Sequence, residues 1–248
     1  MLLDVQPDRA CYRPGETVRL LISLDGPATV EAGPELHIVG SIAFLADDVA
    51  RLTHTVQLAN QSAATAELAW TPPPVAPRGY GVDLQVQDGS GRVLAAASTA
   101  FDVLERWTQA PRYGFLADFS PERTDLDQAM SWLARYHVNG LQFYDWMYRH
   151  DQLLPPDDVF HDPLGRRLSL ATVRKLIDAA HAQGIAAMPY TAVYGASPPF
   201  FQQHPDWALY DAAGEPIPFA EGFLMIMNPT PGSPWCEHLL GQFDEVLE

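Results

Sequence analysis

Hydrophobic and polar positions alternate in short runs over the first 105 residues. Between residues 16 and 24, Val18, Leu20 and Ile22 fall on one side of an extended chain, which is the period-two pattern of a half-buried strand. The same pattern predicts strands at residues 65–70, 80–86 and 92–103. Residues 12–15 and 88–91 are typical of turns between such strands. Short strands at regular spacing favour a β-sandwich.

From about residue 106 the pattern changes to strands that alternate with helices. Short apolar runs predict strands at residues 113–119, 138–144 and 185–190. Helical spacing and end signals predict helices at 125–136, from the N-cap Ser169 to the C′ residue Gly184, and from Ser233-Pro234 to the end of the chain. The segments 145–167 and 191–232 carry no clear period and are interpreted as loops.

Alternating strands and helices indicate parallel strands covered by helices. A closed (β/α)8 barrel needs eight such units in about 250 residues, whereas this half of the chain supplies three. Residues 106–248 are therefore either a small open sheet or a truncated barrel. The sequence ends inside a predicted helix without a C-cap, which favours the truncated barrel. The predicted organisation is multi-domain: a sandwich at 1–105, then the first three βα units of a TIM barrel at 106–248, truncated after the third helix.

Composition and charge exclude several classes of function. Net charge is −16 and Lys175 is the only lysine, which excludes a phosphate-binding surface for nucleic acid and fits poorly with an anionic membrane. No window approaches the roughly 20 apolar residues of a membrane span, and the start of the chain lacks signal-peptide features. There are two cysteines, Cys11 and Cys236, and two widely separated cysteines are neither a disulfide framework nor a zinc site, so we expect two unrelated structural thiols. No metal or cofactor is predicted, and localisation and oligomeric state stay open.

Candidate chemistry follows the ends of the predicted strands, where barrel enzymes place their sites. The second strand is followed by Tyr144, Asp145, Trp146 and, slightly later, His150. Aromatic rings stack on the apolar faces of sugars, and carboxylates accept hydrogen bonds from hydroxyl groups. The competing interpretation is that the rings belong to the core and that Asp145 pairs with Arg149.

The other two strands end in weaker signals. Asp118 follows the first strand and either binds a hydroxyl group or caps a local turn. Tyr190 and Tyr194 follow the third strand and either line the same cleft or pack against it. No Gly-rich phosphate loop or nucleophile elbow is present in the sequence.

Three strings of the second half, at residues 111–119, 135–150 and 190–196, resemble glycoside hydrolase family 66, the dextranases and cycloisomaltooligosaccharide glucanotransferases. Residues 12–16 and 99–107 look like parts of the immunoglobulin-like domain that precedes the catalytic barrel of that family. The resemblance covers nearly the whole chain but only the N-terminal portion of the family's length. It implies an enzyme that acts on α-1,6-glucan and, in this family, outside the cell.

The resemblance also implies residue roles. Family members are retaining enzymes with an Asp nucleophile and a Glu acid/base, and both are expected beyond Glu248, so no catalytic residue is assigned here. Asp145 matches an aspartate that holds sugar hydroxyl groups, and Trp146 and Tyr194 match positions near the same subsite. Thr191 stands where an Asn is expected. The alternatives are a cyclising glucanotransferase, or a fragment that binds sugar without cleaving it.

Overall fold

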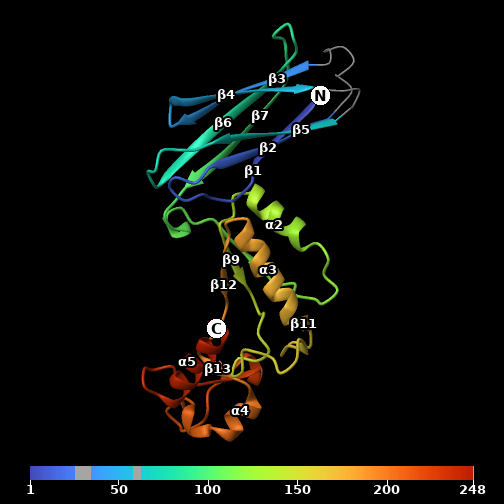
Figure 1. Ribbon diagram of the computed structural model, residues 1–248. Coiled ribbons are helices and arrows are strands. Elements are labelled where there is room, and N and C mark those ends of the chain that lie inside the picture. Colours follow the sequence, from blue (N-terminus) through green and yellow to red (C-terminus); the bar gives the residue numbers. More distant parts are fainter. Residues whose placement is uncertain (26–34, 58–62, 248) are drawn as a thin grey trace. The chain divides into compact units, whose positions relative to one another are not determined.

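The computed structural model describes residues 1–25, 35–57 and 63–247 (Figure 1). Contacts between residues divide the chain into two compact units. Unit 1 comprises Met1–Gly114, Asp127–Leu141 and Asp178–Ala187. Unit 2 comprises Phe115–Leu126, Gln142–Ile177 and Met188–Glu248. The predicted domain boundary at residue 105 stays a prediction.

Two antiparallel sheets make up most of unit 1 (Figure 1). One sheet has the order β1-β2-β5, and the other has the order β4-β3-β6-β7. The strands are β1 (Leu2–Pro7), β2 (Val18–Asp25), β3 (Glu35–Phe44), β4 (Asp47–Gln57), β5 (Ala63–Trp70), β6 (Arg78–Gln87) and β7 (Val93–Val103). One hydrophobic core draws on both sheets, including Ile22 of β2, Ile38 of β3 and Leu84 of β6, so the two sheets form a sandwich.

The strands predicted from alternation are present as β2, β5, β6 and β7. In β2 the side chains alternate strictly between buried and exposed, with Val18, Leu20 and Ile22 inside. Three strands were missed by the sequence pattern, namely β1, β3 and β4. The edge strand β4 buries only Val56, and a strand with so little apolar area leaves almost no period-two signal.

A further sheet has the order β12-β9-β8, where β8 is Tyr113–Leu116, β9 is Gly140–Phe143 and β12 is Ala186–Pro189. The amides of Gly140 and Tyr144 donate to the carbonyls of Arg112 and Leu116, at 3.2 and 2.8 Å. Both pairs are 28 residues apart, which makes the strands parallel. The amides of Ala186 and Tyr190 likewise donate to the carbonyls of Asn139 and Phe143, at 2.9 and 3.0 Å.

Helices lie between consecutive strands of this sheet in the chain, α2 (Leu126–Arg135) and α3 (Leu170–Ala182). The cap predicted for α3 is confirmed, because the hydroxyl oxygen of Ser169 accepts the amide of Thr172 at 3.1 Å. Gly184 follows the helix with φ +70°, as predicted for a C′ glycine. The predicted start of the last helix is also confirmed, since α5 spans Pro234–Leu247.

The segments predicted to be loops contain short elements of unit 2. Residues 145–167 include β10 (Val159–His161), which pairs with β11 (Arg167–Ser169). Residues 191–232 include β13 (Gly195–Ala196), α4 (Pro198–Gln203), β14 (Pro218–Phe219) and β15 (Leu224–Ile226). The loop prediction was wrong at these places, because strands of two or three residues and a helix of six are too short to show a repeating pattern. Short 3₁₀ turns add η1 (Trp107–Gln109), η2 (Pro205–Trp207) and η3 (Ala220–Gly222).

Two further features are the state of the cysteines and the length of the helices. Cys11 and Cys236, both described, are free thiols, as the sequence predicts. Within the described ranges, no helix is long and apolar enough to cross a membrane.

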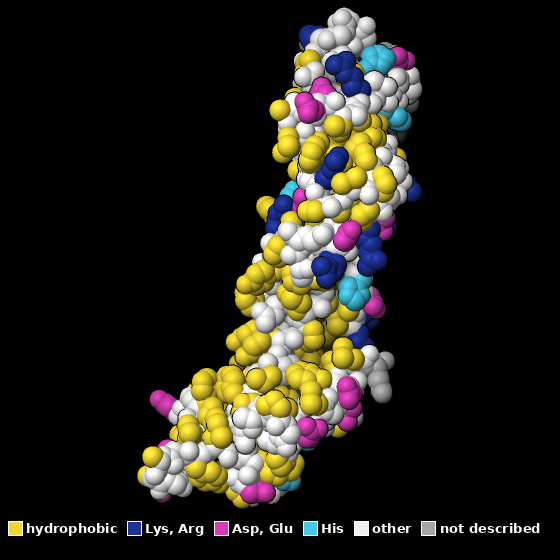
Figure 2. All heavy atoms as spheres, turned by 90° about the vertical axis from the view of Figure 1, so that its left-hand side faces the viewer, with side chains coloured by type: hydrophobic (Ala, Val, Ile, Leu, Met, Phe, Trp, Pro, Cys, Tyr) yellow, Lys and Arg dark blue, Asp and Glu magenta, His cyan; other side chains and the backbone are white. Residues whose placement is uncertain are grey.

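Unit 2, which carries α4 and α5, exposes many large hydrophobic side chains, and Figure 2 shows them gathered in patches at its surface. Leu240 on α5 is 50% exposed and Val193 is 47% exposed. Exposed hydrophobic side chains gathered in this way favour association in water.

The buried side chain of Asn139 joins the entry of β8 to the entry of β9 in unit 1. Its carbonyl oxygen accepts the amide of Arg112 at 2.8 Å, and its side-chain nitrogen donates to the carbonyl of Ala110 at 3.0 Å. Asn139→Ala leaves two backbone groups without partners, so we expect the free energy of unfolding to fall by about 2–3 kcal/mol. Unfolding in urea, monitored by circular dichroism, measures this free energy. Gln202→Ala, at an exposed site on α4, is the control, and an unchanged midpoint for Asn139→Ala contradicts the prediction.

The exposed hydrophobic side chains of unit 2 predict self-association of the isolated chain. Sedimentation velocity over a hundredfold range of concentration should show a sedimentation coefficient that rises with concentration. Leu240→Glu replaces an exposed hydrophobic side chain of unit 2 by a charge and should reduce the rise, whereas Val75→Glu, at an exposed site of unit 1, should not. A single monomeric species at every concentration contradicts the prediction.

Candidate functional site

A pocket of about 250 Å³ lies wholly within unit 2, beside the ends of β9 and β12. Tyr144 follows β9 directly, and Tyr190 follows β12 directly. The pocket is lined by Tyr144, Asp145, Met147, His150, Asp162, Pro163, Leu164, Tyr190, Tyr194, Phe219, Phe223 and Leu224. Parallel strands therefore deliver their following residues to one place, as expected for the carboxyl ends of a parallel sheet.

Five of the residues predicted from sequence meet in this pocket: Tyr144, Asp145, His150, Tyr190 and Tyr194. Their common location was not visible in the sequence, where they are spread over some fifty positions. Their proposed roles toward a ligand stay predictions.

The other two predicted residues have different surroundings. Trp146 is buried, with 3% exposure, and its indole nitrogen donates to the carbonyl of Tyr190 at 3.0 Å. It does not line the pocket, but it bonds to the backbone of Tyr190, which does. Asp118 is exposed, and its carboxylate accepts the amide of Ser120 at 3.0 Å, which is the local turn that the sequence left open as an alternative.

Aromatic rings form much of the pocket surface. The rings of Tyr144 and Tyr190 lie 4.6 Å apart between centroids. The rings of Tyr194 and Phe219 meet edge to face at 5.2 Å. Phe219 comes from β14 and was missed by the sequence analysis, because β14 has two residues and no repeating pattern. These surfaces can pack against the apolar face of a ligand while the tyrosine hydroxyl groups bond to it.

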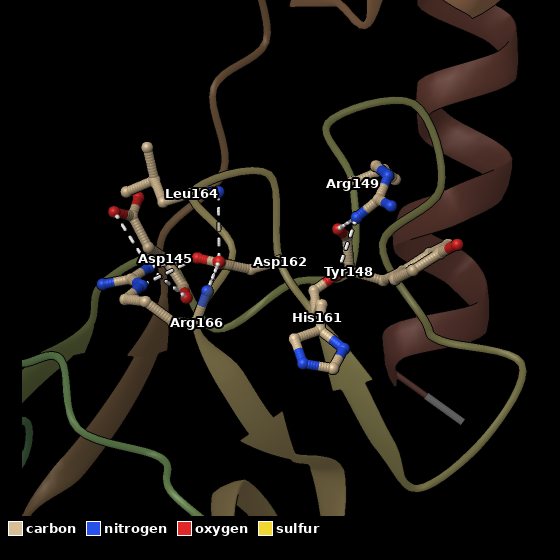
Figure 3. A network of polar contacts seen from close by, with 7 residues as sticks. All are labelled: Asp145, Tyr148, Arg149, His161, Asp162, Leu164 and Arg166. Atoms are coloured by element: carbon tan, nitrogen blue, oxygen red, sulfur yellow. Dashed lines mark hydrogen bonds and ion pairs between the residues drawn. The ribbon is translucent and has the colours of Figure 1, made fainter.

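Asp145 has a left-handed backbone, with φ +53°, immediately after Tyr144. Such a conformation costs energy for a residue with a side chain. Its carboxylate is 24% exposed and lies 3.4 Å from a terminal nitrogen of Arg166 (Figure 3).

The alternative pairing of Asp145 with Arg149 is wrong. A terminal nitrogen of Arg149 instead donates to the carbonyls of Tyr148 and His161, at 2.8 and 2.9 Å. Its guanidinium also lies 4.0 Å from the ring centroid of Tyr148. Figure 3 shows this contact apart from the one at Asp145.

Arg166 is held by Asp162 in the turn between β10 and β11. The Asp162 carboxylate is 2% exposed and accepts Nε and Nη2 of Arg166 at 2.8 and 2.6 Å. It also accepts the amides of Leu164 and Arg166, at 3.1 and 2.7 Å. A buried carboxylate with this many donors is structural, and it fixes the guanidinium that faces Asp145. The sequence analysis missed both residues, which lie in a segment it interpreted as a loop.

His150 and Tyr190 are held in their neutral forms. Burial lowers the pKa of His150, although Asp145, Asp151 and Asp162 act in the opposite direction. Its Nδ1 is buried and has no hydrogen-bond partner among the described residues. Burial raises the pKa of Tyr190, and Tyr194, Tyr144 and Asp145 add to the rise. Near neutral pH the pocket thus combines one partly exposed carboxylate with uncharged hydrogen-bonding groups.

This arrangement suits a neutral ligand rich in hydroxyl groups. The two carboxylates that line the pocket differ in availability, because Asp162 is saturated with donors and Asp145 is partly open. In the described ranges, no group of three or more His, Cys, Asp or Glu side chains is placed to hold a metal ion.

Similar proteins were found by both sequence and structure. A cycloisomaltooligosaccharide glucanotransferase of Niallia circulans is 28% identical, over 97% of this chain and 26% of its own. A dextranase of Streptococcus salivarius is 26% identical, over 68% of this chain and 23% of its own. The chain thus spans about a quarter of the length of these curated relatives.

The crystal structure of a cycloisomaltooligosaccharide glucanotransferase from Paenibacillus sp., complexed with cycloisomaltoheptaose, superimposes with a TM-score of 0.81. The identity is 25%, over 98% of this chain and 36% of the other. The family model for glycosyl hydrolase family 66 matches residues 7–248. A match over nearly all of the sequence, with the fold shared at this level, shows that the chain belongs to glycosyl hydrolase family 66.

Proposed function

We propose that this chain is the N-terminal portion of a glycosidase that acts on α-1,6-glucan, and that the pocket of unit 2 is one wall of its sugar site. The observation that carries the proposal is the meeting of Tyr144, Asp145, Tyr190 and Tyr194 at the carboxyl ends of parallel strands. Barrel enzymes bind their substrates at this end of the sheet.

The proposed architecture is an immunoglobulin-like sandwich at 1–105 followed by the first three βα units of a (β/α)8 barrel at 106–248. Two antiparallel sheets over one core support the first part. The order β8, β9, β12, with a helix between consecutive strands and parallel hydrogen bonding, supports the second.

Each residue of the pocket has a proposed part in holding sugar. Asp145 accepts hydrogen bonds from sugar hydroxyl groups, and Arg166 keeps its carboxylate in place. The rings of Tyr144 and Tyr190 pack on the apolar face of a pyranose. The neutral imidazole of His150 lines the same pocket.

Bond cleavage is proposed to follow the retaining route, in which an Asp attacks the anomeric carbon and a Glu first donates and then accepts a proton. Those two carboxyl groups must lie about 5–5.5 Å apart. Asp145 has an arginine rather than a second open carboxylate beside it. We propose that both catalytic groups lie beyond Glu248, as the family resemblance implies, and that this chain alone binds sugar without cleaving it.

Cyclising transfer is the second candidate, because two of the matched relatives carry that name. Hydrolase and transferase share the covalent intermediate and differ in whether water or a sugar hydroxyl group attacks it. The wall described here serves both reactions equally.

The role of Asp145 can be tested by titrating isomaltotriose into the full 248-residue chain in a calorimeter. Loss of a charged hydrogen-bond acceptor in Asp145→Asn should weaken binding about tenfold. Asp157→Asn, at an exposed site of unit 2, is the matched control and should bind like the unaltered chain. Equal affinity for Asp145→Asn and the unaltered chain excludes the proposed site.

The proposed position of the catalytic pair predicts that this chain releases no reducing sugar from dextran. The measurement is a reducing-end assay over a day of incubation, with a retaining dextranase as the positive control. Turnover by the 248-residue chain that survives repeated purification means that the catalytic carboxylates are within it.

A further inference from the structure

Two large exposed aromatic side chains lie at the C-terminal end of α2 in unit 1, Trp132 within the helix and Tyr136 directly after its last residue. Trp132 and Tyr136 are one helical turn apart, and they are 52% and 71% exposed. Gln128, one turn earlier on the same stripe, is exposed as well. Residues spaced by four positions share one face of a helix, and the amide of Tyr136 still donates to the carbonyl of Trp132 at 3.2 Å, so Gln128, Trp132 and Tyr136 follow one stripe of α2 and its last turn.

The two rings have a fixed arrangement. Their planes differ by 26° and their centroids are 6.5 Å apart. The guanidinium of Arg135 lies 5.7 Å from the ring centroid of Trp132, which is within the range of a cation–π contact. Each ring still keeps half or more of its surface open to solvent.

Arg135 is itself tied to the sandwich. Its Nη1 donates to a carboxylate oxygen of Asp4 at 2.6 Å and to the side chain of Gln6 at 3.2 Å, and its Nη2 bonds to the other oxygen of Asp4. A bidentate pair of this kind restricts the side chain strongly. The cation beside Trp132 is thus held in place before any ligand arrives, which lowers the entropic cost of binding.

The border of the ring pair is polar. Gln128 stands next to it along the helix, and Asp4 and Gln6 stand beside Arg135. A stable protein interface buries about 800 Å² on each partner and has an apolar centre, whereas this apolar area consists of two rings. Flat apolar faces bordered by hydrogen-bonding groups fit a pyranose, which has an apolar face and a rim of hydroxyl groups.

We propose that Trp132 and Tyr136 form a second sugar-binding platform, which shares no residue with the pocket of unit 2 and takes units of a neutral glucan chain. A net charge of −16 disfavours an anionic polymer. The choice of an α-1,6-glucan rests on the proposed function, while the stacked rings and their polar border by themselves select a neutral polysaccharide.

Electrophoresis of the full chain through native gels with and without dextran tests the platform. Dextran should slow the unaltered chain. Trp132→Ala and Tyr136→Ala each remove one stacking face and should weaken retardation about threefold to tenfold. Trp132→Phe and Tyr136→Phe keep a ring and should restore most of it. Val75→Ala, at another exposed hydrophobic site of unit 1, is the control and should migrate like the unaltered chain.

The outcomes separate the platform from the pocket. Retardation that survives Asp145→Asn but not Trp132→Ala supports the platform, even where isomaltotriose titration has excluded the pocket. Retardation unchanged by both alanine variants overturns the platform and leaves the proposed function standing. The platform is also overturned if dextran slows no variant, or if Trp132→Ala abolishes self-association of the chain without changing its mobility in dextran, which identifies a protein interface instead.

Discussion

Parallel pairing of β8, β9 and β12 is the constraint on which the candidate site depends. The amide of Tyr144 bonds to β8, and the amide of Tyr190 bonds to β9, so the residues that follow these strands are brought to one edge. A shift of one residue in either pairing turns the side chains to the opposite face. Asn139 secures the start of this arrangement by bonding the backbone ahead of β8.

The two carboxylates that line the pocket, Asp162 and Asp145, have different roles. Asp162 is buried, and its carboxylate accepts hydrogen bonds from the guanidinium of Arg166 and from backbone amides of the surrounding turn. Arg166 then faces Asp145, which stays partly open. Burying a carboxylate is costly unless donors compensate it, so the structural carboxylate is the saturated one and the available carboxylate is the one near solvent. The neutral states of His150 and Tyr190 complete a surface suited to an uncharged ligand.

Aromatic side chains occur in this protein in three different settings. Tyr80 and Phe101 stack inside the sandwich, Tyr144 and Tyr190 meet at the pocket, and Trp132 and Tyr136 lie exposed at the C-terminal end of α2. Ring contacts alone do not distinguish core from binding surface. Exposure and the neighbouring hydrogen-bonding groups make the distinction, since a ring that serves a sugar must keep a face free.

The sequence by itself determined the change from alternating strands to strands that alternate with helices, the caps at Ser169 and Gly184, the family resemblance, and five of the pocket residues. These are local signals, carried by side-chain period, backbone preference or an unbroken string. Tertiary structure alone decided that Trp146 does not line the pocket, that Asp145 faces Arg166 rather than Arg149, and that Asp162 and Phe219 join the site. Those contacts connect residues from short elements or irregular turns, where no periodic pattern exists and where the partner of a charged group is set by the path of the backbone.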